Sequence, residues 1–329
     1  MTSQKFDTTC IGNAIVDVIG KTDDRFLADE GLTKNSMMLI DKDRAEDLYG
    51  KMQSAMEMSG GSAGNTAAGI ASLGGKSAYI GKVRDDQLGE IFSHDIQAIG
   101  VTFETAKSTN GAATARCLVL VTPDAHRTMN TYLGACIELG PEDIDPDMIA
   151  ASKVTYMEGY LWDPEQGKAA FRKAAAISHS ANQQVALTLS DSFCVDRYRD
   201  EFKDFMQDGV DILFANEDEI KSLYQTDSFD DALDAVRDQV DIACLTRSEK
   251  GSVIVSGRDV HEISAEQNVE VVDTTGAGDL FAAGFLFGYT NGRNLADSGR
   301  IGSIAAAEII SHYGARPSVN LQDLIAQKV

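Results

Sequence analysis

The second half of the chain alternates short apolar runs with longer amphipathic stretches, and no other feature constrains the fold as much. Residues 154–157 form an apolar run, and residues 164–181 have the periodicity of a helix. The same pair of patterns recurs at 185–189 with 193–206 and at 212–214 with 217–224. Strands that alternate with helices form parallel sheets with right-handed crossovers. We therefore expect a three-layer α/β/α sandwich around a central, mostly parallel sheet.

The first 135 residues have a different pattern, in which strand-like segments predominate. The segments with strand periodicity are 6–11, 15–19, 36–40, 102–106, 112–121 and 127–133. Turn-forming residues separate the last three, which favours an antiparallel arrangement. Helices are expected at 43–56, 66–73 and 87–99. We interpret the chain as a single domain, 1–329, with a small β-sheet lid inserted in two pieces, at about 14–40 and 102–133.

The chain is strongly acidic, and this charge limits its partners. It has 29 Lys and Arg residues against 51 Asp and Glu residues, which gives a formal charge of −22. Such a surface repels phosphates and anionic lipids, so neither nucleic acid nor a membrane is expected as a partner. The sequence has no secretory signal and no apolar stretch of the roughly 20 residues that a membrane span needs. Five scattered cysteines indicate a cytoplasmic location, and the isolated histidines and cysteines do not support a transition-metal site.

A glycine-rich segment at 273–279, with the sequence DTTGAGD, follows a strand-like run and opens an apolar helix. Glycines at a helix start let another group approach closely, and the free N–H groups there attract an anion. Asp279 lies in the first turn, where its carboxylate can accept a proton from an alcohol that attacks phosphorus. The alternative is an ordinary N-cap by Thr275 or Asp273. Two glycines between two aspartates exceed what a cap needs, so the segment favours phosphoryl transfer.

Two other glycine patterns are similar to nucleotide-binding motifs but do not fit them. Segment 74–77 lacks the first glycine of a P-loop, and it precedes a strand, the reverse of the order that this motif needs. Phe281 stands where a dinucleotide-binding fingerprint requires its third glycine. These patterns argue against a P-loop ATPase and a Rossmann dehydrogenase.

Polar residues near the N-terminus are candidates for binding a polyol. Asn65 ends the glycine-rich segment 60–65 and offers both a donor and an acceptor. Asn13 and Asp17 flank a short strand, and the Asp17 carboxylate can accept two hydrogen bonds from a vicinal diol. The alternatives are an Asn cap, a flexible loop and an Asp in a turn or an edge strand.

Asn216 and Glu219 begin a helix directly after the apolar run 212–214. At the carboxyl edge of a parallel sheet, these two residues can help to hold hydrated Mg²⁺. The alternative is that acidic residues here only stabilise the positive end of the helix dipole.

Together these segments resemble the PfkB, or ribokinase-like, family of carbohydrate and nucleoside kinases over nearly the whole chain. The matching segments are 273–279 with 281–285 for the C-terminal signature, 60–65 with Gly81 and 85–89 for the N-terminal signature, and Asn216 to Glu219 for the N-x-x-E element. The resemblance implies a ribokinase-like fold and the use of ATP with Mg²⁺.

The resemblance also implies residue roles. Asp279 would be the catalytic base, and the amides of Gly276, Ala277 and Gly278 would form an anion hole. The sugar hydroxyls would bind at Asn13, Asp17, Gly61, Ser62 and Asn65. ATP would contact Asn216, Thr246, Arg247, Gly251, Thr275, Gly278, Ala305 and Ile309. Mg²⁺ would be held through water by Asn216 and Glu219, and a monovalent cation such as K⁺ would lie near Asp273 and Thr275.

The chain departs from the family pattern in one loop. Arg247 and Ser248 follow Thr246, where the family usually has a glycine and where the loop approaches the ATP phosphates. Arg247 would then supply positive charge in an otherwise acidic protein.

Within the family, segments 11–17, 60–65 and 127–134 are most similar to adenosine kinases. Adenine is a flat apolar surface and needs apolar walls, whereas a free hexose needs polar ones. The residues expected to form such walls are Ile15, Met37, Leu39 and Tyr160, with Met38, Leu161 and Trp162 beside them. Ordinary core packing is the alternative for each of them.

The sequence thus predicts an ATP- and Mg²⁺-dependent kinase that phosphorylates the 5′-hydroxyl of adenosine or a close relative. One alternative is the same fold acting on a free sugar such as ribose or fructose. Another is a non-catalytic regulator that binds a nucleoside or sugar. The protein would be a monomer or a homodimer formed through the lid.

Overall fold

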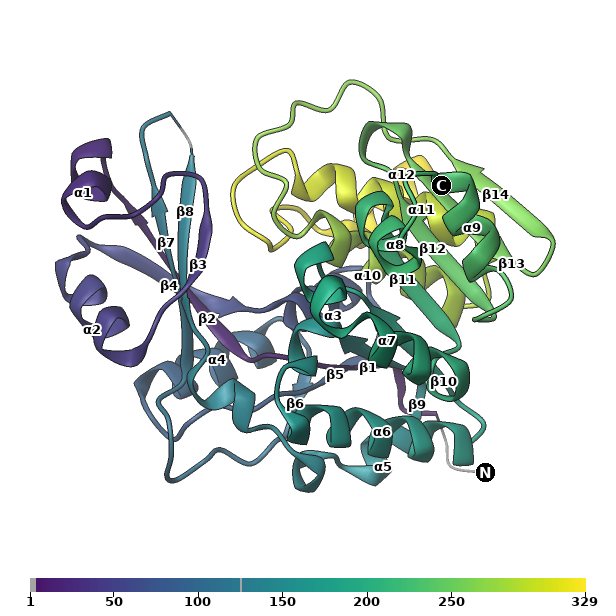
Figure 1. The fold of residues 1–329 in the computed structure, drawn as a ribbon, viewed down its shortest axis with the longest axis horizontal. Coiled ribbons are helices and arrows are strands. Elements are labelled where there is room, and N and C mark those ends of the chain that lie inside the picture. The colour runs from purple at the N-terminus through teal and green to yellow at the C-terminus, as the bar shows by residue number, and fades with distance from the viewer. Residues whose placement is uncertain (1–3, 125) are drawn as a thin grey trace.

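The computed structural model describes residues 4–124 and 126–329, which form two β-sheets flanked by helices (Figure 1). The strands are β1 (Phe6–Ile11), β2 (Ile15–Lys21), β3 (Met37–Leu39), β4 (Ala55–Gly60), β5 (Ser77–Ile80), β6 (Thr102–Phe103), β7 (Ala115–Val121), β8 (Arg127–Tyr132), β9 (Ser152–Glu158), β10 (Gln184–Thr188), β11 (Ile212–Asn216), β12 (Ile242–Thr246), β13 (Ser252–Ser256) and β14 (Asp259–Ile263). The α-helices are α1 (Asp24–Asp29), α2 (Lys42–Lys51), α3 (Ser62–Ser72), α4 (Gln87–Ala98), α5 (Pro146–Ala150), α6 (Glu165–Ser180), α7 (Ser192–Gly209), α8 (Glu217–Tyr224), α9 (Phe229–Val236), α10 (Ala277–Thr290), α11 (Leu295–Ile309) and α12 (Leu321–Lys328). None of the described helices combines the length and the apolar character that crossing a membrane requires.

The larger sheet has nine strands in the order β14-β13-β12-β11-β10-β9-β1-β5-β6. Neighbours from β12 to β6 are parallel, and β13 and β14 add antiparallel strands at one edge. The predicted central, mostly parallel sheet is therefore confirmed. Parallel strands all end at the same edge of a sheet, and this edge is where open α/β sheets bind ligands.

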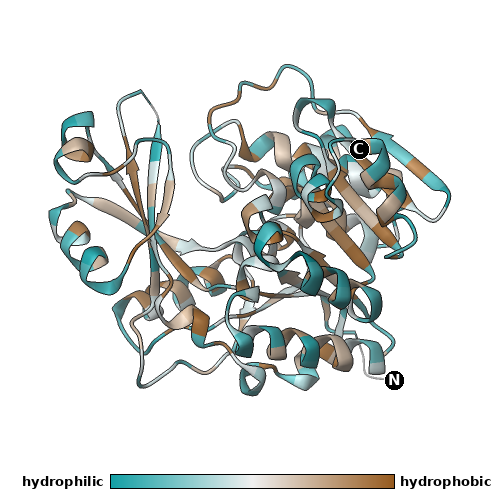
Figure 2. Ribbon diagram, viewed as in Figure 1, coloured by the Kyte–Doolittle hydropathy of each residue, from teal (hydrophilic) through white to brown (hydrophobic). Residues whose placement is uncertain are grey.

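Helices cover both faces of the large sheet and complete the predicted three-layer sandwich. Successive residues of β9 point to opposite faces, so Tyr156 packs in the core beneath α3, α10 and α11, whereas Met157 packs in the core beneath α6 and α7. Figure 2 shows the apolar strands of the large sheet between helices whose outer faces are hydrophilic. Burial of both sheet faces explains why these strands are nearly continuous apolar runs in the sequence.

The smaller sheet, called the lid below, has five strands in the order β3-β8-β7-β2-β4. It stands beside the large sheet, at the left of Figure 1, and it carries the short helices α1 and α2. Strands β7 and β8 form the antiparallel pair expected from the turn between them. The lid contains strands from both of the segments predicted for it.

Two details of the lid differ from the sequence prediction. Segment 102–106 is predicted to belong to the lid, but its strand β6 pairs with β5 in the large sheet. The helix predicted at 43–56 ends at Lys51, and the next residues form lid strand β4 beside β2. In both cases pairing with a strand elsewhere in the chain decides the structure, and the local pattern does not carry that information.

Helices α3 and α10 pack closely, and a glycine permits the approach. A Cβ atom added at Gly69 would lie 2.7 Å from Ala283 Cβ and 2.7 Å from Leu280 Cδ1. Real Cβ atoms do not approach other atoms this closely, so α10 would have to move to accept a larger residue.

We predict that Gly69→Ala destabilises the protein by about 1–3 kcal/mol, because overpacking costs more than the gain in helix propensity. Gly50→Ala is the matched control, because Gly50 also lies in a helix but a Cβ there meets nothing within 4 Å. That variant should be neutral or more stable by up to about 1 kcal/mol. Urea unfolding of the three proteins measures both values. Equal stability of the two variants would contradict the close packing of α3 and α10.

Candidate active site

The carboxylate of Asp279 lies where the N-termini of α3 and α10 meet. Ser62 Oγ donates to Asp279 Oδ1 at 2.6 Å, and Asn65 Nδ2 donates to Oδ2 at 2.9 Å. Ser62 and Asn65 are three residues apart on α3 and therefore share one face of that helix. Three residues that the sequence predicts for the site are thus brought together, although Asp279 is more than 200 positions from the other two along the chain.

The environment of Asp279 makes its carboxylate more basic than usual. Burial raises the pKa of Asp279, and the hydrogen bonds from Ser62 and Asn65 and the charge of Arg316 oppose this rise. A carboxylate with a raised pKa that is held in one orientation suits proton abstraction from an alcohol.

The start of α10 has main-chain amides available for an anion. Gly276, the residue before the helix, has a φ of 80° and no side-chain hydrogen bond caps the helix among the described residues. The Ala277 amide donates to Thr274 O at 3.2 Å, so it is used within the turn. A Cβ added at Gly278 meets nothing within 4 Å, so the space beside this residue is open. The geometry therefore fits an anion at the Gly276 and Gly278 amides better than at Ala277.

Two buried side-chain oxygens of the residues predicted to bind sugar hydroxyls lack hydrogen-bond partners in the described part of the chain. These are Asn13 Oδ1 and Asn65 Oδ1, and the two residues are only 3% and 6% exposed. An unsatisfied buried acceptor costs about 1–3 kcal/mol, and such groups in native proteins call for an explanation. Hydroxyl groups of a bound sugar would donate to these oxygens and remove that cost.

Two glycines before α3 let the chain pass close to β2 and to the residues just before it. Gly61 has a φ of 83°, and a Cβ there would lie 2.1 Å from Asn13 O. A Cβ at Gly60 would lie 2.5 Å from Asp17 Oδ2.

Burial raises the pKa of Asp17 to about 6, while the charges of Arg316 and Arg127 oppose the rise. Asp17 is therefore mostly ionised at neutral pH and can accept hydrogen bonds from a diol.

One face of the lid carries most of the apolar residues predicted to contact a base. Ile15 and Asp17 lie on the same face because they are two residues apart in β2, and the registers of β2, β7, β8 and β3 add Met37 and Leu39 to it. Met37 and Leu39 are 49% and 55% exposed. Arg127 lies on this face too, since it occupies the odd-numbered register of β8. This face is therefore an accessible apolar surface that also carries the charged residues Asp17, Lys21 and Arg127.

The segment after β9 has one accessible residue among those predicted to contact a base. Tyr160 is 39% exposed, and its amide donates to Ser190 Oγ at 3.3 Å. Leu161 and Trp162 are fully buried, and Trp162 packs against aromatic rings of α6 and α7. Core packing, the alternative considered for these residues, is correct for Leu161 and Trp162.

Four of the residues predicted to contact ATP, Asn216, Thr246, Arg247 and Gly251, lie at or just after the carboxyl ends of β11 and β12. Asn216 and Thr246 are register partners at the ends of these strands. Gly251 has a φ of 88°, and its carbonyl accepts from the Arg247 amide at 2.7 Å. The Arg247 guanidinium pairs with Glu217 at 3.0 Å and stacks over an aromatic ring, and Lys250 lies 3.5 Å from the same carboxylate. One carboxylate thus faces two cations, and contact of Arg247 with ATP stays a prediction.

Two other residues predicted for the nucleotide do not reach a surface. Ala305 and Ile309 on α11 have no exposed area and belong to the core beneath α10. Neither side chain can contact a nucleotide in this structure. The family resemblance named these two residues, but it does not show that this face of α11 points inward.

Asn216 and Glu219 satisfy each other in a capping box at the start of α8. Asn216 Oδ1 accepts from the Glu219 amide at 2.8 Å, and the Asn216 amide and Nδ2 donate to the two Glu219 oxygens at 2.9 and 2.6 Å. Burial raises the pKa of Glu219 to about 7. Each carboxylate oxygen keeps a free lone pair, so the pair fits a hydrated Mg²⁺ contacted through water. The described residues contain no group of three or more His, Cys, Asp or Glu side chains placed to bind a metal directly.

Asp273 and Thr275 do not fit the predicted monovalent cation. Asp273 Oδ1 accepts from the amide and hydroxyl of Thr275 at 3.0 and 2.7 Å. Asp273 Oδ2 accepts from the Gly314 amide at 3.2 Å and pairs with the Arg127 guanidinium. A guanidinium thus stands at the carboxylate where a monovalent cation is expected.

Two residues that the sequence analysis does not single out support the site. Glu158, which is 1% exposed, accepts from the Asn13 amide at 2.8 Å and the Ala63 amide at 2.7 Å. Arg316 donates to Gly64 O at 2.6 Å, so it also holds the first turn of α3. Glu158 directly follows the predicted strand 154–157, and a polar residue at the carboxyl end of a parallel strand is a usable signal. No comparable signal marks Arg316.

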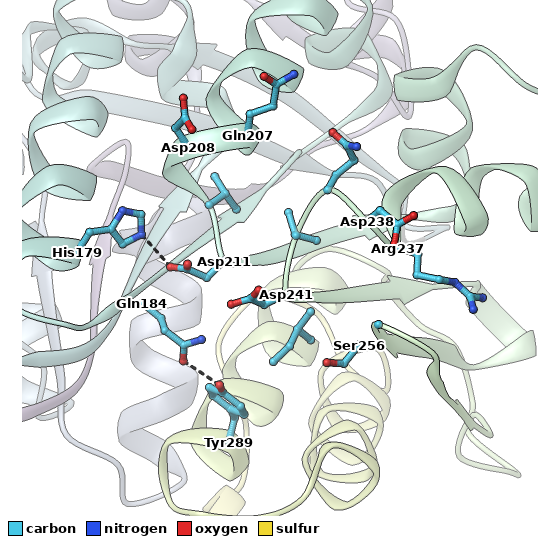
Figure 3. A pocket seen from close by; sticks show the side chains of 15 residues that line it. His179, Gln184, Gln207, Asp208, Asp211, Arg237, Asp238, Asp241, Ser256 and Tyr289 are labelled. Carbon is cyan, nitrogen blue, oxygen red and sulfur yellow. Dashed lines mark hydrogen bonds and ion pairs between the residues drawn. The ribbon is translucent and has the colours of Figure 1, made fainter.

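A separate cleft of about 660 Å³ lies at the opposite edge of the large sheet (Figure 3). Asp211 and Asp241, just before β11 and β12, line it together with His179 and Tyr289. His179 Nε2 contacts Asp211 Oδ2 at 3.0 Å. This cleft is at the amino ends of the parallel strands, so it is distinct from the site around Asp279.

Residues 6–322 match the family described as pfkB family carbohydrate kinase. The chain belongs to this family. It is therefore a phosphotransferase that acts on an alcohol group, and the ribokinase-like fold expected from the sequence is confirmed.

Some proteins similar to this chain are described as adenosine kinases, and others are described as sugar kinases. A solved structure described as adenosine kinase from Sinorhizobium meliloti is 55% identical, covers 99% of this chain and 100% of its own, and has a TM-score of 0.91. A structure described as a probable sugar kinase protein from Rhizobium etli is 54% identical, covers 99% of both chains and has a TM-score of 0.92. The adenosine kinase of Saccharomyces cerevisiae is 26% identical over 92% of this chain and 94% of its own.

We predict that Glu158→Gln destabilises the protein most at low pH. Burial raises the pKa of Glu158 in the folded protein to about 7, above its ordinary 4.5. Between these two pKa values the unfolded chain loses the proton more readily than the folded protein, so the free energy of unfolding of the wild type falls as the pH rises. Gln does not ionise, although it leaves one buried amide without an acceptor at a cost of about 1–3 kcal/mol. The stability advantage of the wild type over the variant should therefore shrink between about pH 5 and pH 8.

Urea unfolding at both pH values measures this advantage. Glu201→Gln is the control, because hydrogen bonding to Lys168 lowers the pKa of Glu201 and its titration lies below this pH range. Its effect should be equal at both pH values. An advantage of Glu158 that grows with pH would contradict the raised pKa.

Proposed function

We propose that the protein transfers the γ-phosphoryl group of ATP to the 5′-hydroxyl of adenosine or a closely related purine nucleoside. The strongest support is that the site combines buried polar atoms without hydrogen-bond partners and an exposed apolar face of the lid. Asn13 Oδ1, Asn65 Oδ1 and the Asp17 carboxylate lie on the sugar side. Met37 and Leu39 lie on the exposed lid face that a purine ring would cover.

Proton transfer would involve Asp279. Its carboxylate, held by Ser62 and Asn65, accepts the hydroxyl proton as the oxygen attacks phosphorus. The amides at the start of α10 stabilise the negative charge that develops on the transferred group. Mg²⁺, when bound with ATP, neutralises phosphate charge, and Asn216 and Glu219 would hold it through water. Closure of the lid excludes water, so the alcohol rather than water receives the phosphoryl group.

A free sugar is the second candidate acceptor. The support for it is the 54% identical structure described as a probable sugar kinase. A free pentose would use the same hydroxyl-binding atoms but would leave the apolar lid face uncovered. Exposed apolar surface next to a bound polar ligand gains nothing from that ligand, so the lid face favours the nucleoside.

A panel of acceptors with ATP and Mg²⁺, read by ADP release, tests the proposal. We expect kcat/KM for adenosine to exceed that for ribose or fructose by at least about 10², because burial of the base adds binding energy that a free sugar lacks. Saturable turnover with a free sugar and none with adenosine would contradict the proposal.

A pair of variants adds a structural control to this panel. Met37→Ser should raise KM for adenosine by about 3- to 10-fold, because it removes apolar contact area beside the base. Val260→Ser changes an equally accessible apolar residue of β14 and should leave KM unchanged. An effect of the same size in both variants would show that Met37 does not contact the acceptor.

A further inference from the structure

One ion pair joins the lid directly to the loop that precedes the anion hole. Arg127 is the first residue of lid strand β8, and its Nη1 contacts Asp273 Oδ2. The two side chains are only 9% and 7% exposed. Removing one partner of a buried pair leaves an uncompensated charge, which is far more costly than losing a surface pair.

The same carboxylate shapes the turn that leads into α10. Its other oxygen accepts from the amide and hydroxyl of Thr275. The Gly314 amide donates to the oxygen that pairs with Arg127. Asp273 thus holds both the 273–276 turn and the loop that packs against it, since a Cβ at Gly276 would lie 3.0 Å from Ala315 Cβ. The position of the open amide at Gly278 depends on this arrangement.

A carboxylate in this position needs a nearby positive charge. Four hydrogen-bond donors reach Asp273, but three of them are neutral amide or hydroxyl groups. Neutral donors orient a carboxylate without balancing its charge. Arg127 is the cation that the structure pairs with it.

We propose that Arg127 takes the place of a bound monovalent cation at Asp273, so that the lid itself supplies the positive charge that the anion hole requires. Arg127 is then a positioning residue that acts through Asp273 and Thr275. Because Arg127 belongs to the lid, its charge reaches Asp273 only when the lid lies against the core. Lid closure and completion of the anion hole become one event, and K⁺ is not needed for it.

This inference rests on the proposed use of the α10 amides as an anion hole, but not on which alcohol is phosphorylated. Its first test therefore needs no substrate. Melting temperatures are compared in about 150 mM KCl and 150 mM choline chloride, which match in ionic strength. The wild type should melt at the same temperature in both salts. Arg127→Gln should melt about 2 °C or more higher in KCl, because K⁺ binds the freed carboxylate.

Two further variants identify the residue that would respond to K⁺. In the double variant Arg127→Gln with Asp273→Asn, the carboxylate is absent and the KCl effect should disappear. Lys34→Gln is the matched control. Lys34 is another positively charged residue of the lid, but its partners are Asp24 and Asp124, which belong to the lid segments and not to the loop of Asp273. It should show no KCl effect.

Turnover provides the second test, with the acceptor that gives the highest rate. Wild-type kcat should differ by less than about twofold between the two salts. In choline chloride, kcat of Arg127→Gln should be lower than that of the wild type by a factor of at least about 10. In KCl, much of this loss in kcat should be recovered. Arg127→Lys, which keeps the charge, should be less impaired than Arg127→Gln and respond less to KCl.

Strong stimulation of the wild type by K⁺ over choline would overturn the proposal, because it would show that Arg127 does not replace the cation. Loss of turnover in Arg127→Gln without any KCl effect on melting or kcat would overturn it as well, and would favour direct contact of Arg127 with ATP. An acceptor other than adenosine would overturn the proposed function alone, because the melting test is independent of the acceptor.

Discussion

The close approach of α3 and α10 is the constraint on which the candidate active site depends. Gly69 lets the two helices pack without a side chain between them, next to Ala283 and Leu280. Their N-termini then lie together, and Ser62 and Asn65 on α3 reach the carboxylate of Asp279 on α10. Two helix dipoles point their positive ends at one place, which favours both the carboxylate and an incoming phosphate.

The lid and the core meet through buried charges, and this matters in a protein with a net charge of −22. An anionic nucleotide needs local positive potential that the acidic surface does not provide. Arg127 pairs with Asp273, and Arg316 binds carbonyl groups of lid strand β4 and helix α3. The charges of both arginines also oppose the rise in pKa that burial imposes on Asp17. Positive charge is thus concentrated at the site and held by the same contacts that position the lid.

The sequence predicted the parts of the site that local chemistry determines. The glycines and Asp279 at the start of α10 could be singled out because two glycines between two aspartates exceed what a helix cap needs, and the order of strands and helices sufficed for the three-layer fold. Pairing between distant segments could not be read in the same way. Strand β4 and the guanidinium at Asp273 both depend on contacts across the fold, and the inward face of Ala305 depends on how α11 packs. Glu158 is an intermediate case. The sequence shows that it follows a strand, but it does not show that its carboxylate accepts from two distant amides.

The central claim is that Asp279 acts as the base beside an open helix N-terminus. The most direct measurement compares Asp279→Asn with the wild type in kcat and in calorimetric Kd for the acceptor. Ser62 can still donate to the Asn oxygen and only the acceptor of Asn65 Nδ2 is lost, so the site should keep most of its shape. The account predicts that kcat falls by at least about 10² while Kd changes by less than about threefold. Turnover within a few-fold of the wild type, with the acceptor bound equally well, would contradict it.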